Sequence, residues 1–167
     1  ELKTEGCLFQ NIHFNNRSEN PFRDFTFYRS LKKIYHERKP DFIFHYVIKP
    51  NIYGSLAAAA CGISSIAVIT GLGYAFARKN WLRKTVSFLY KRALKNTKEV
   101  WFLNRDDEDI FIQRKLVAGH KVKILPGECI NPDYFAASPF RPVARSKAFQ
   151  FLMSTRLLKS KGVRIYV

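Results

Sequence analysis

The stretch DFIFHYVIKPNIYGSLAAAACGISSIAVITGLG, residues 41–73, decides the fold. Asp41 to Ile48 is almost entirely apolar or aromatic, which is typical of a strand buried on both faces. A helix through Ser55 to Cys61 follows, with Asn51 as a candidate cap and a glycine at its end. Ser65 to Thr70 is a second buried strand. A strand, a helix and a strand in this order predict one parallel crossover unit.

The same alternation continues on both sides of this stretch. The expected elements are a strand at Cys7 to Phe14, a helix at Phe25 to Arg38, a basic helix at about Trp81 to Asn96, a strand at Glu99 to Leu103, a helix capped by Asn104 and a strand at Lys121 to Leu125. Strands that alternate with helices predict an α/β fold, a Rossmann-like parallel sheet with crossover helices.

A membrane span is the alternative for the uncharged part of the chain. No charged residue lies between Lys49 and Arg78, which is long enough to cross a bilayer. However, glycines and serines punctuate this segment, and Pro50 and Asn51 open it. We therefore favour a helix, a turn and a buried strand over one continuous span.

The last quarter of the chain has a different pattern. Pro126 to Pro142 is irregular and is interpreted as a linker. Phe149 to Ser154 is a further strand, and Leu157 to Val167 begins a helix. We therefore expect one domain over residues 1–142 and the start of a second over residues 143–167.

The formal net charge of the 167 residues is +16. Such a charge attracts nucleic acid, acidic lipid or phosphorylated ligands, and composition alone does not choose among them. A basic nucleic-acid-binding module would interleave cations with exposed aromatic side chains. Here the aromatic residues gather in runs typical of buried strands, so we expect no nucleic-acid partner.

The three cysteines, Cys7, Cys61 and Cys129, are far apart in the sequence. An odd number without paired spacing predicts reduced thiols and a cytosolic setting. Closely spaced Cys or His ligands are absent from the sequence, so no zinc site is expected.

Two short segments follow the buried strands of the opening stretch. Because ligands bind at the carboxyl ends of strands in open parallel sheets, Lys49, Asn51 and Tyr53 are expected to face a crevice there. Gly71 and Gly73 follow the second strand, where glycines let backbone N–H groups approach a ligand. The alternative for both segments is structural, with a Pro-Asn pair that shapes a turn and glycines that form a tight loop.

A sharper candidate is TRLLKSKG, Thr155 to Gly162. Arg156 and Lys161 are five residues apart in a predicted strand-to-helix turn. An arginine fork and a lysine charge beside a helix start suit a diphosphate. The alternative is two solvated cations on a basic protein.

Other polar residues favour structural roles. The acidic run Arg105 to Asp109 (RDDED) complements the dipole of a helix's first turn and needs no metal. His45 lies at a predicted strand end, where core packing is favoured over catalysis.

Together, five segments resemble the family 4 glycosyltransferases, which have two Rossmann-like domains in the GT-B fold. The segments are IKPNIYGSLAA (Ile48 to Ala58), ITGLGYAF (Ile69 to Phe76), VWFLNRDD (Val100 to Asp107), ILPGECINPDYF (Ile124 to Phe135) and TRLLKSKGV (Thr155 to Val163). They occur in family order and indicate a partial GT-B N-terminal domain. The first two are most similar to the subgroup that builds bacterial capsule, O-antigen (lipopolysaccharide) or related surface polysaccharides on a lipid-diphosphate carrier.

The resemblance implies a retaining hexosyl or N-acetylhexosaminyl transferase. Its donor would be a nucleotide sugar, a UDP-sugar, and its acceptor a polyprenyl-diphosphate-linked saccharide. No metal or other cofactor is implied, because cationic side chains and helix ends hold the leaving diphosphate. Arg156 and Lys161 match the family's diphosphate-binding pair. The family's loops at the interdomain cleft match at Gly71, Gly73, Gly127 and Glu128.

The chain departs from the family pattern at several points. Thr155 stands where the family usually has Gly. Ile48 and Lys49 occupy the place of a His found in many members, so His45 inherits no role. The family's first strand, glycine loop and helix would precede the first residue, and its nucleotide pocket would follow the last. We therefore expect the chain alone to be inactive.

The basic helix at about Trp81 to Asn96 has two different faces. Leu82, Val86, Leu89 and Ala93 fall on one of them. The cations opposite or beside it are Arg83, Lys84, Lys91, Arg92 and Lys95. Trp81 and Tyr90 suit a membrane interface. We expect the apolar stripe to pack on the sheet and the cations to face an anionic membrane, which predicts a cytoplasmic protein, peripheral on the inner face of the plasma membrane.

Overall fold

The fold comes from a computed structural model of the chain. It describes residues 4, 6–12, 20–72, 76, 81–127, 133–134, 151–155, 157 and 162–166. The chain divides into two compact units, Glu1–Cys129 and Ile130–Val167. The boundary expected from the sequence, between residues 142 and 143, lies outside the described residues.

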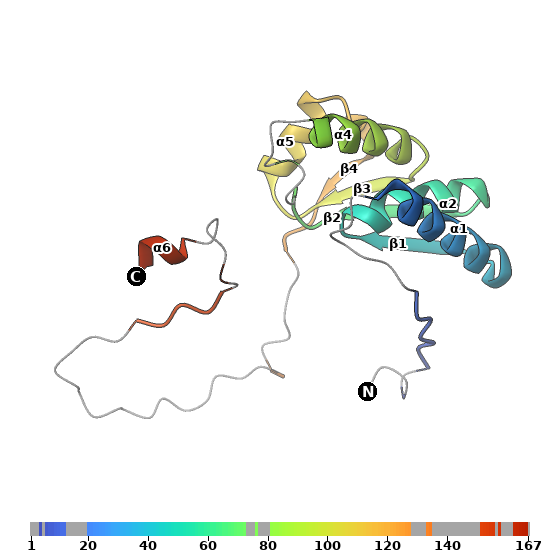
Figure 1. Ribbon diagram of the computed structural model, residues 1–167, viewed down its shortest axis with the longest axis horizontal. Helices are drawn as coiled ribbons and strands as arrows, with labels where there is room; N and C mark the ends of the chain where they lie inside the picture. Colours follow the sequence, from blue (N-terminus) through green and yellow to red (C-terminus); the bar gives the residue numbers. More distant parts are fainter. Residues whose placement is uncertain are drawn as a thin grey trace. The chain divides into compact units, whose positions relative to one another are not determined.

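The first unit contains a four-stranded parallel sheet (Figure 1). Its strands are β1 (Phe42–Tyr46), β2 (Ser64–Ile69), β3 (Glu99–Phe102) and β4 (Val122–Ile124), in the order β1-β2-β3-β4. The register aligns His45 with Ala67 and Val100. This arrangement confirms the predicted Rossmann-like α/β class.

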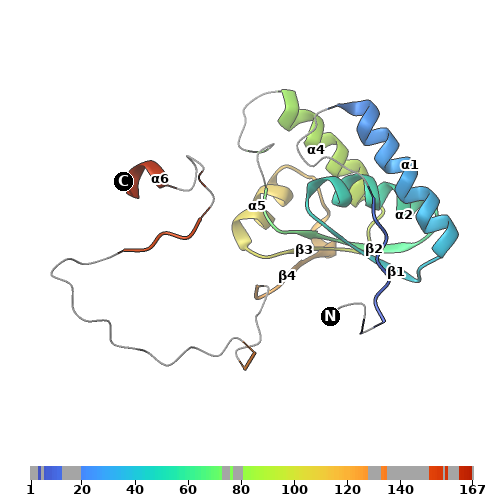
Figure 2. The ribbon, with the colours of Figure 1, turned by 60° about the horizontal axis from the view of Figure 1, so that its bottom comes forward.

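The helices of this unit lie on one face of the sheet (Figure 2). They are α1 (Pro21–Arg38), the π-helix η1 (Pro50–Gly54), α2 (Ser55–Ala60), α4 (Trp81–Leu94) and α5 (Arg105–Gln113), with a short 3₁₀ helix η2 (Gly119–Lys121) before β4. Parallel crossovers are almost always right-handed. When each one steps in the same direction across the sheet, the crossover helices therefore fall on the same face.

The opposite face corrects one expectation about β1. We predicted a strand buried on both faces and extending to Ile48, but Phe44 and Tyr46 are 49% and 48% exposed and the strand ends at Tyr46. In the described part of the chain no helix covers that face, and β1 is the edge strand. The central strand β2 is buried as predicted.

The main core lies between the sheet and α4, α5 and η1. Its largest side chains are aromatic: Phe76, Tyr90, Phe102 and Phe111, with ring centroids of neighbouring pairs 5.1–6.1 Å apart. Burying one such side chain contributes about 1.5–3 kcal/mol. This cluster fixes the helices that frame the carboxyl edge of the sheet.

Helix starts follow the local sequence signals. Oδ1 of Asn20 accepts the Phe22 N–H at 3.0 Å, and Pro21 occupies the first turn, so α1 begins four residues before the predicted Phe25. Oδ1 of Asn104 accepts the Asp107 N–H at 2.8 Å, which confirms the predicted cap of α5. The acidic residues after it occupy the first turn of the helix.

Other expectations differ from the structure or lie outside it. Residues 7–12, predicted as part of a strand, form none, and residues 13–14 are outside the described part. Residues 151–154, predicted as strand, also form none, and α6 covers only Val163–Tyr166. The Tyr166 hydroxyl donates to the Phe151 carbonyl in this second unit. Cys7 and Cys61 are free thiols, and Cys129 is outside the described residues.

No helix in the described part of the chain is both long enough and apolar enough to cross a membrane.

Candidate functional site

The carboxyl edge of the sheet carries an unusual turn after β1. Val47 has a φ of 62°, a conformation that costs a β-branched residue about 1–3 kcal/mol. The chain then enters η1, whose five residues include the predicted site residues Asn51 and Tyr53. Because π-helical turns are frequent at functional sites, this strained turn is the first candidate for one.

The side chains of Lys49 and Tyr53 converge on one carboxylate of α1. The Lys49 ammonium lies 2.5 Å from Oδ1 of Asp24, and the Tyr53 hydroxyl donates to Oδ2 at 3.0 Å. Both charged side chains are largely buried, at 12% and 14% exposure. Burial, followed by the charge and hydrogen bond of Asp24, raises the pKa of Tyr53. We had predicted no role for Asp24, but its contacts with Lys49 and Tyr53 connect the turn to α1.

We expected Asn51 to face a crevice, but it does not. Its side chain is 1% exposed, and its Nδ2 donates to the Val68 carbonyl of β2 at 2.8 Å. It is also no helix cap, because the chain is already helical from Ile48. Within the part of the chain that the structure describes, Oδ1 of Asn51 is buried without a hydrogen-bond partner. An unsatisfied buried oxygen costs about 1–3 kcal/mol, so it adds to the strain of this turn.

Behind the turn, His45 links three elements. Its ring is 3% exposed, with Nε2 3.0 Å from the Tyr35 hydroxyl of α1 and Nδ1 3.3 Å from Oγ of Ser55 in α2. Gly54 packs directly on the ring. Burial lowers the pKa of His45 to about 4 and, with a smaller contribution from Cys61, raises the pKa of Tyr35 to about 12. The neutral imidazole therefore holds α1 and α2 against β1, which agrees with the predicted core role.

Acid is expected to weaken the fold through His45. Its folded-state pKa of about 4 lies below its ordinary value of 6.5, so its contribution is fully present above pH 6.5 and is lost as the pH falls through 4. Linkage gives a loss of about 2 kcal/mol between pH 8 and pH 5. Urea unfolding across this range should show a shallower pH dependence for His45→Asn than for the native chain. His36→Gln, at an exposed histidine, should follow the native curve; parallel curves for all three proteins would contradict the assignment.

The glycine loops lie at the same edge of the sheet as the strained turn. Gly71 follows β2 with a φ of 149°, and Gly127 follows β4 with a φ of 115°, conformations that residues with a side chain rarely adopt. Because all four strands are parallel, their carboxyl ends share one edge, where ligands bind in open α/β sheets. Among the described residues, a Cβ at either glycine would meet no atom within 4 Å, which leaves space beside the backbone there.

Four site residues from the sequence cannot be placed. Gly73, Glu128, Arg156 and Lys161 lie outside the described residues.

The basic helix α4 presents the faces that its sequence predicts. Val86 and Ala93 are buried, and Leu82 and Leu89 pack partly buried against the core. The predicted membrane-facing cations Lys84, Lys91, Arg92 and Lys95 are exposed, and Arg83 is half-buried.

The aromatic residues of α4 require one correction. Tyr90, which we expected at a membrane interface, is 1% exposed because its ring packs against Phe76 and Phe111 in the core. Phe88, for which we had predicted no role, is 65% exposed instead. Phe88 follows Trp81 by seven residues, about two helical turns, so the sequence already indicated that the two rings lie on the same face of the helix.

The turn after β1 and the two glycine loops determine which chemistry the carboxyl edge of the sheet can support. Lys49 and Tyr53 engage Asp24, so the turn offers a rigid frame, and the two glycine loops offer accessible backbone. Backbone N–H groups in such loops stabilise anions. Among the described residues, no group of three or more His, Cys, Asp or Glu side chains could hold a metal ion.

The first three strands of the chain match a known protein family. A protein-family model described as Glycosyl transferase 4-like matches residues 1–104, which include β1 to β3 and the strained turn. No curated protein matches the chain.

Proposed function

This chain belongs to the glycosyl transferase 4-like family, and from that premise we propose that it supplies the acceptor side of a transferase acting on lipid-linked saccharides. The donor is a nucleotide sugar, a UDP-sugar, and the acceptor is a saccharide on a polyprenyl diphosphate. Transfer of the hexosyl or N-acetylhexosaminyl group retains the anomeric configuration. The product belongs to a bacterial surface polysaccharide, made at the cytoplasmic face of the membrane.

The observation that carries this proposal is the strained turn inside the family match. Val47, η1 and the buried Asn51 together hold an unfavourable local structure at the edge where parallel sheets bind ligands. Strain of this kind persists only when the surroundings enforce it, and it clusters at functional sites. The Lys49–Asp24–Tyr53 contacts provide that enforcement.

The proposed chemistry uses electrostatics in place of a metal. As the donor bond breaks, negative charge develops on the leaving diphosphate. Fixed positive groups aimed at that charge usually supply the largest part of the rate enhancement. We assign this role to Arg156 and Lys161, and we assign the backbone of the Gly71 and Gly127 loops to the lining of the cleft.

A transfer assay tests this function. The protein, as its gene encodes it, is incubated in EDTA with radiolabelled UDP-glucose, UDP-galactose or UDP-N-acetylglucosamine and with polyprenyl-diphosphate-linked saccharides. We expect label from one donor to enter the organic phase, and NMR of the product to show the donor's anomeric configuration.

Each negative result has a defined meaning. Transfer that is abolished by EDTA and restored by Mg²⁺ would contradict the metal-free mechanism. Label that enters only water-soluble products would contradict the lipid-linked acceptor. Binding to RNA without transfer from any nucleotide sugar would favour the nucleic-acid alternative.

A further inference from the structure

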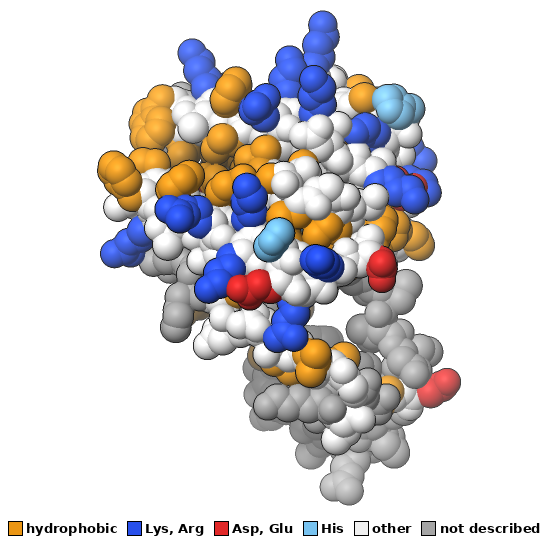
Figure 3. Space-filling view, turned by 90° about the vertical axis from the view of Figure 1, so that its right-hand side faces the viewer, with side chains coloured by type: hydrophobic (Ala, Val, Ile, Leu, Met, Phe, Trp, Pro, Cys, Tyr) orange, Lys and Arg blue, Asp and Glu red, His pale blue; other side chains and the backbone are white. Residues whose placement is uncertain are grey.

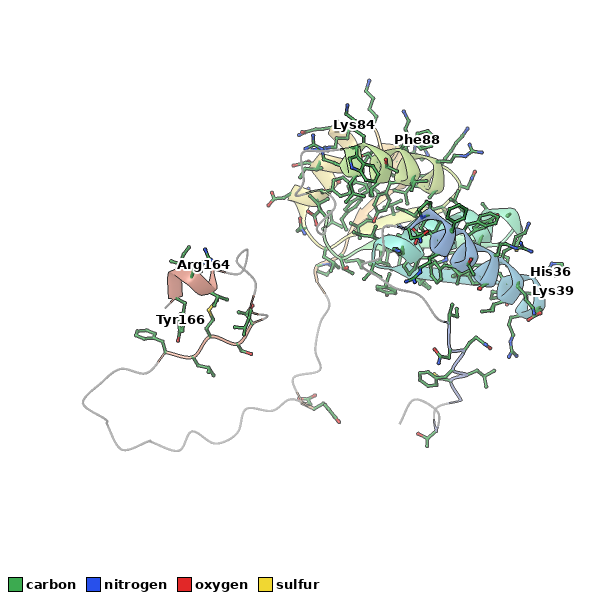
Figure 4. The ribbon with its side chains drawn as sticks, in the orientation of Figure 1. His36, Lys39, Lys84, Phe88, Arg164 and Tyr166 are labelled. Atoms are coloured by element: carbon green, nitrogen blue, oxygen red, sulfur yellow. The ribbon has the colours of Figure 1, made fainter. Side chains whose placement is uncertain are left out.

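The outward side of α4 carries a regular line of aromatic and cationic side chains. It consists of Trp81, Lys84, Phe88 and Lys91 of α4 and of Lys95, which directly follows the helix, spaced three and four residues apart, and we name it the α4 stripe. This spacing keeps the four helical residues on one face of α4. Trp81 and Phe88 are 63% and 65% exposed, and the three lysines are exposed as well. Figure 4 shows Lys84 and Phe88 directed away from the sheet.

Nothing acidic in this part of the sequence balances the stripe. No Asp or Glu occurs between Asp41 and Glu99, a stretch that includes the whole of α4. On the face drawn in Figure 3, Lys and Arg side chains project along the upper rim, with hydrophobic side chains between them. Such a surface has a strong preference for an anionic partner.

The outer face of α1 also carries exposed aromatic and basic side chains, and one of its lysines, Lys33, is paired with Glu37. Phe22 and Phe25 are 81% and 58% exposed. An open depression of about 570 Å³ is lined by Phe25, Tyr28, Arg29, Lys32, Lys33 and His36. Both α1 and α4 pack against η1, and Figure 2 places both on the same side of the sheet. The two helices therefore present basic and aromatic side chains on the same side of the sheet, and we call this side the basic and aromatic layer.

We propose that this layer docks on an anionic lipid bilayer, with the α4 stripe as its principal contact. Exposed Trp and Phe rings suit the boundary between head groups and acyl chains, while lysines suit the anionic head groups. Along the helix, Trp81 and Phe88 are about 10 Å apart, since each residue advances 1.5 Å. That separation is too wide for the stacking of successive bases, which favours lipid over nucleic acid.

This docking deepens the proposed function, because it would bring the carboxyl edge of the sheet to an acceptor that is itself in the membrane. The two proposals nevertheless stand on different observations. Vesicle binding is measured without any sugar donor, so its failure would leave the transferase assignment intact.

Co-sedimentation of the chain with lipid vesicles tests the docking. Vesicles of phosphatidylcholine alone are compared with vesicles containing 30% phosphatidylglycerol, at about 50 and 500 mM salt. We expect binding to the anionic vesicles at low salt and a loss of binding at high salt, since salt screens exposed charges.

Two variants locate the contact. Each cation near an anionic surface contributes about fivefold to binding, so Lys84→Gln/Lys91→Gln/Lys95→Gln should weaken it by at least tenfold. Trp81→Ser/Phe88→Ser keeps every charge and should also weaken it severalfold. As a matched control, Lys98→Gln/Lys115→Gln/Lys123→Gln removes the same charge from other exposed positions and should stay within about twofold of the native chain.

Three results would overturn the docking. They are equal binding to neutral and anionic vesicles, an equal loss in the α4 stripe and control variants, and tighter binding to single-stranded RNA that depends on the same stripe. Circular dichroism of each variant confirms that a loss of binding is not a loss of fold.

Discussion

Replacing Gly54 with alanine is expected to lower the free energy of unfolding by about 2–3 kcal/mol. A Cβ at this position would lie 2.5 Å from Cδ2 and 2.6 Å from Nε2 of His45. The His45 ring cannot move without cost, because its two nitrogens are hydrogen-bonded to Tyr35 and Ser55 and its side chain is buried. Either the ring gives up these hydrogen bonds or the helix moves away from β1.

The magnitudes decide the sign of this effect. Alanine in a helix is favoured over glycine by about 1 kcal/mol, which would stabilise the variant. Overpacking a core costs about 1–3 kcal/mol, and each lost hydrogen bond adds about 0.5–1.5 kcal/mol. The steric and polar terms exceed the helix term, so a net loss remains.

Urea denaturation followed by circular dichroism measures this loss, with Gly119→Ala as the control. A Cβ at Gly119 would meet nothing within 4 Å, so that variant should unfold within about 0.5 kcal/mol of the native chain. In a His45→Ala background the clash disappears, and Gly54→Ala should then be neutral or stabilising. If Gly54→Ala costs the same in both backgrounds, the contact with His45 is not its cause.

The order of the elements could be predicted because each strand and helix has its own local signal. The apolar runs at Ile66 to Ile69 and Val100 to Phe102 produced strands, and Asn104 capped its helix as its sequence indicates. The error over β1 has a different origin. An apolar strand sequence reports hydrophobicity, whereas exposure of Phe44 and Tyr46 depends on which face the crossover helices cover. That is a property of the topology, not of the segment.

The candidate site was harder to predict because its contacts join distant segments. Lys49 and Tyr53 were found from their place after a buried strand, but their common partner Asp24 is 25 and 29 residues away in α1. The positive φ of Val47 and the π-helix of η1 have no sequence signature that we could use. Asn51 matched a cap by residue type, yet the continuous helix from Ile48 draws its side chain into the core.

On α4, periodicity gave the buried stripe correctly but not the roles of its aromatic residues. Tyr90 and Phe88 are two positions apart, so a helix turns them about 200° from one another. Only one can face the core with Val86 and Ala93, and that is Tyr90. Placing Tyr90 at a membrane interface from its chemistry alone neglected this angle, which the sequence already contained.

Substitution of Arg156 or Lys161 by alanine is expected to lower turnover of the intact enzyme by about 10²-fold or more. Both residues lie outside the described part of the chain and beyond residues 1–104, which the family model matches. This prediction therefore rests on the resemblance of Thr155 to Gly162 to the family's diphosphate-binding segment and on the proposed function. An interaction with charge that develops only in the transition state affects kcat and kcat/KM alike. Arg156→Lys keeps the charge but loses the two-pronged donor geometry, so it should recover only part of the activity.

Lys159→Ala provides the matched control, because it removes one positive charge from the same segment without touching the pair. If the pair binds the leaving diphosphate, the control keeps turnover within about threefold, while the two alanine variants lose activity with unchanged circular dichroism. A loss of affinity for the nucleotide sugar at constant kcat would assign the pair to uniform donor binding instead. Two results would contradict the diphosphate role. One is near-native kcat and KM in Arg156→Ala and Lys161→Ala, and the other is an equal loss of activity in Lys159→Ala. Either result would show that these cations contribute only to the general positive charge of the protein.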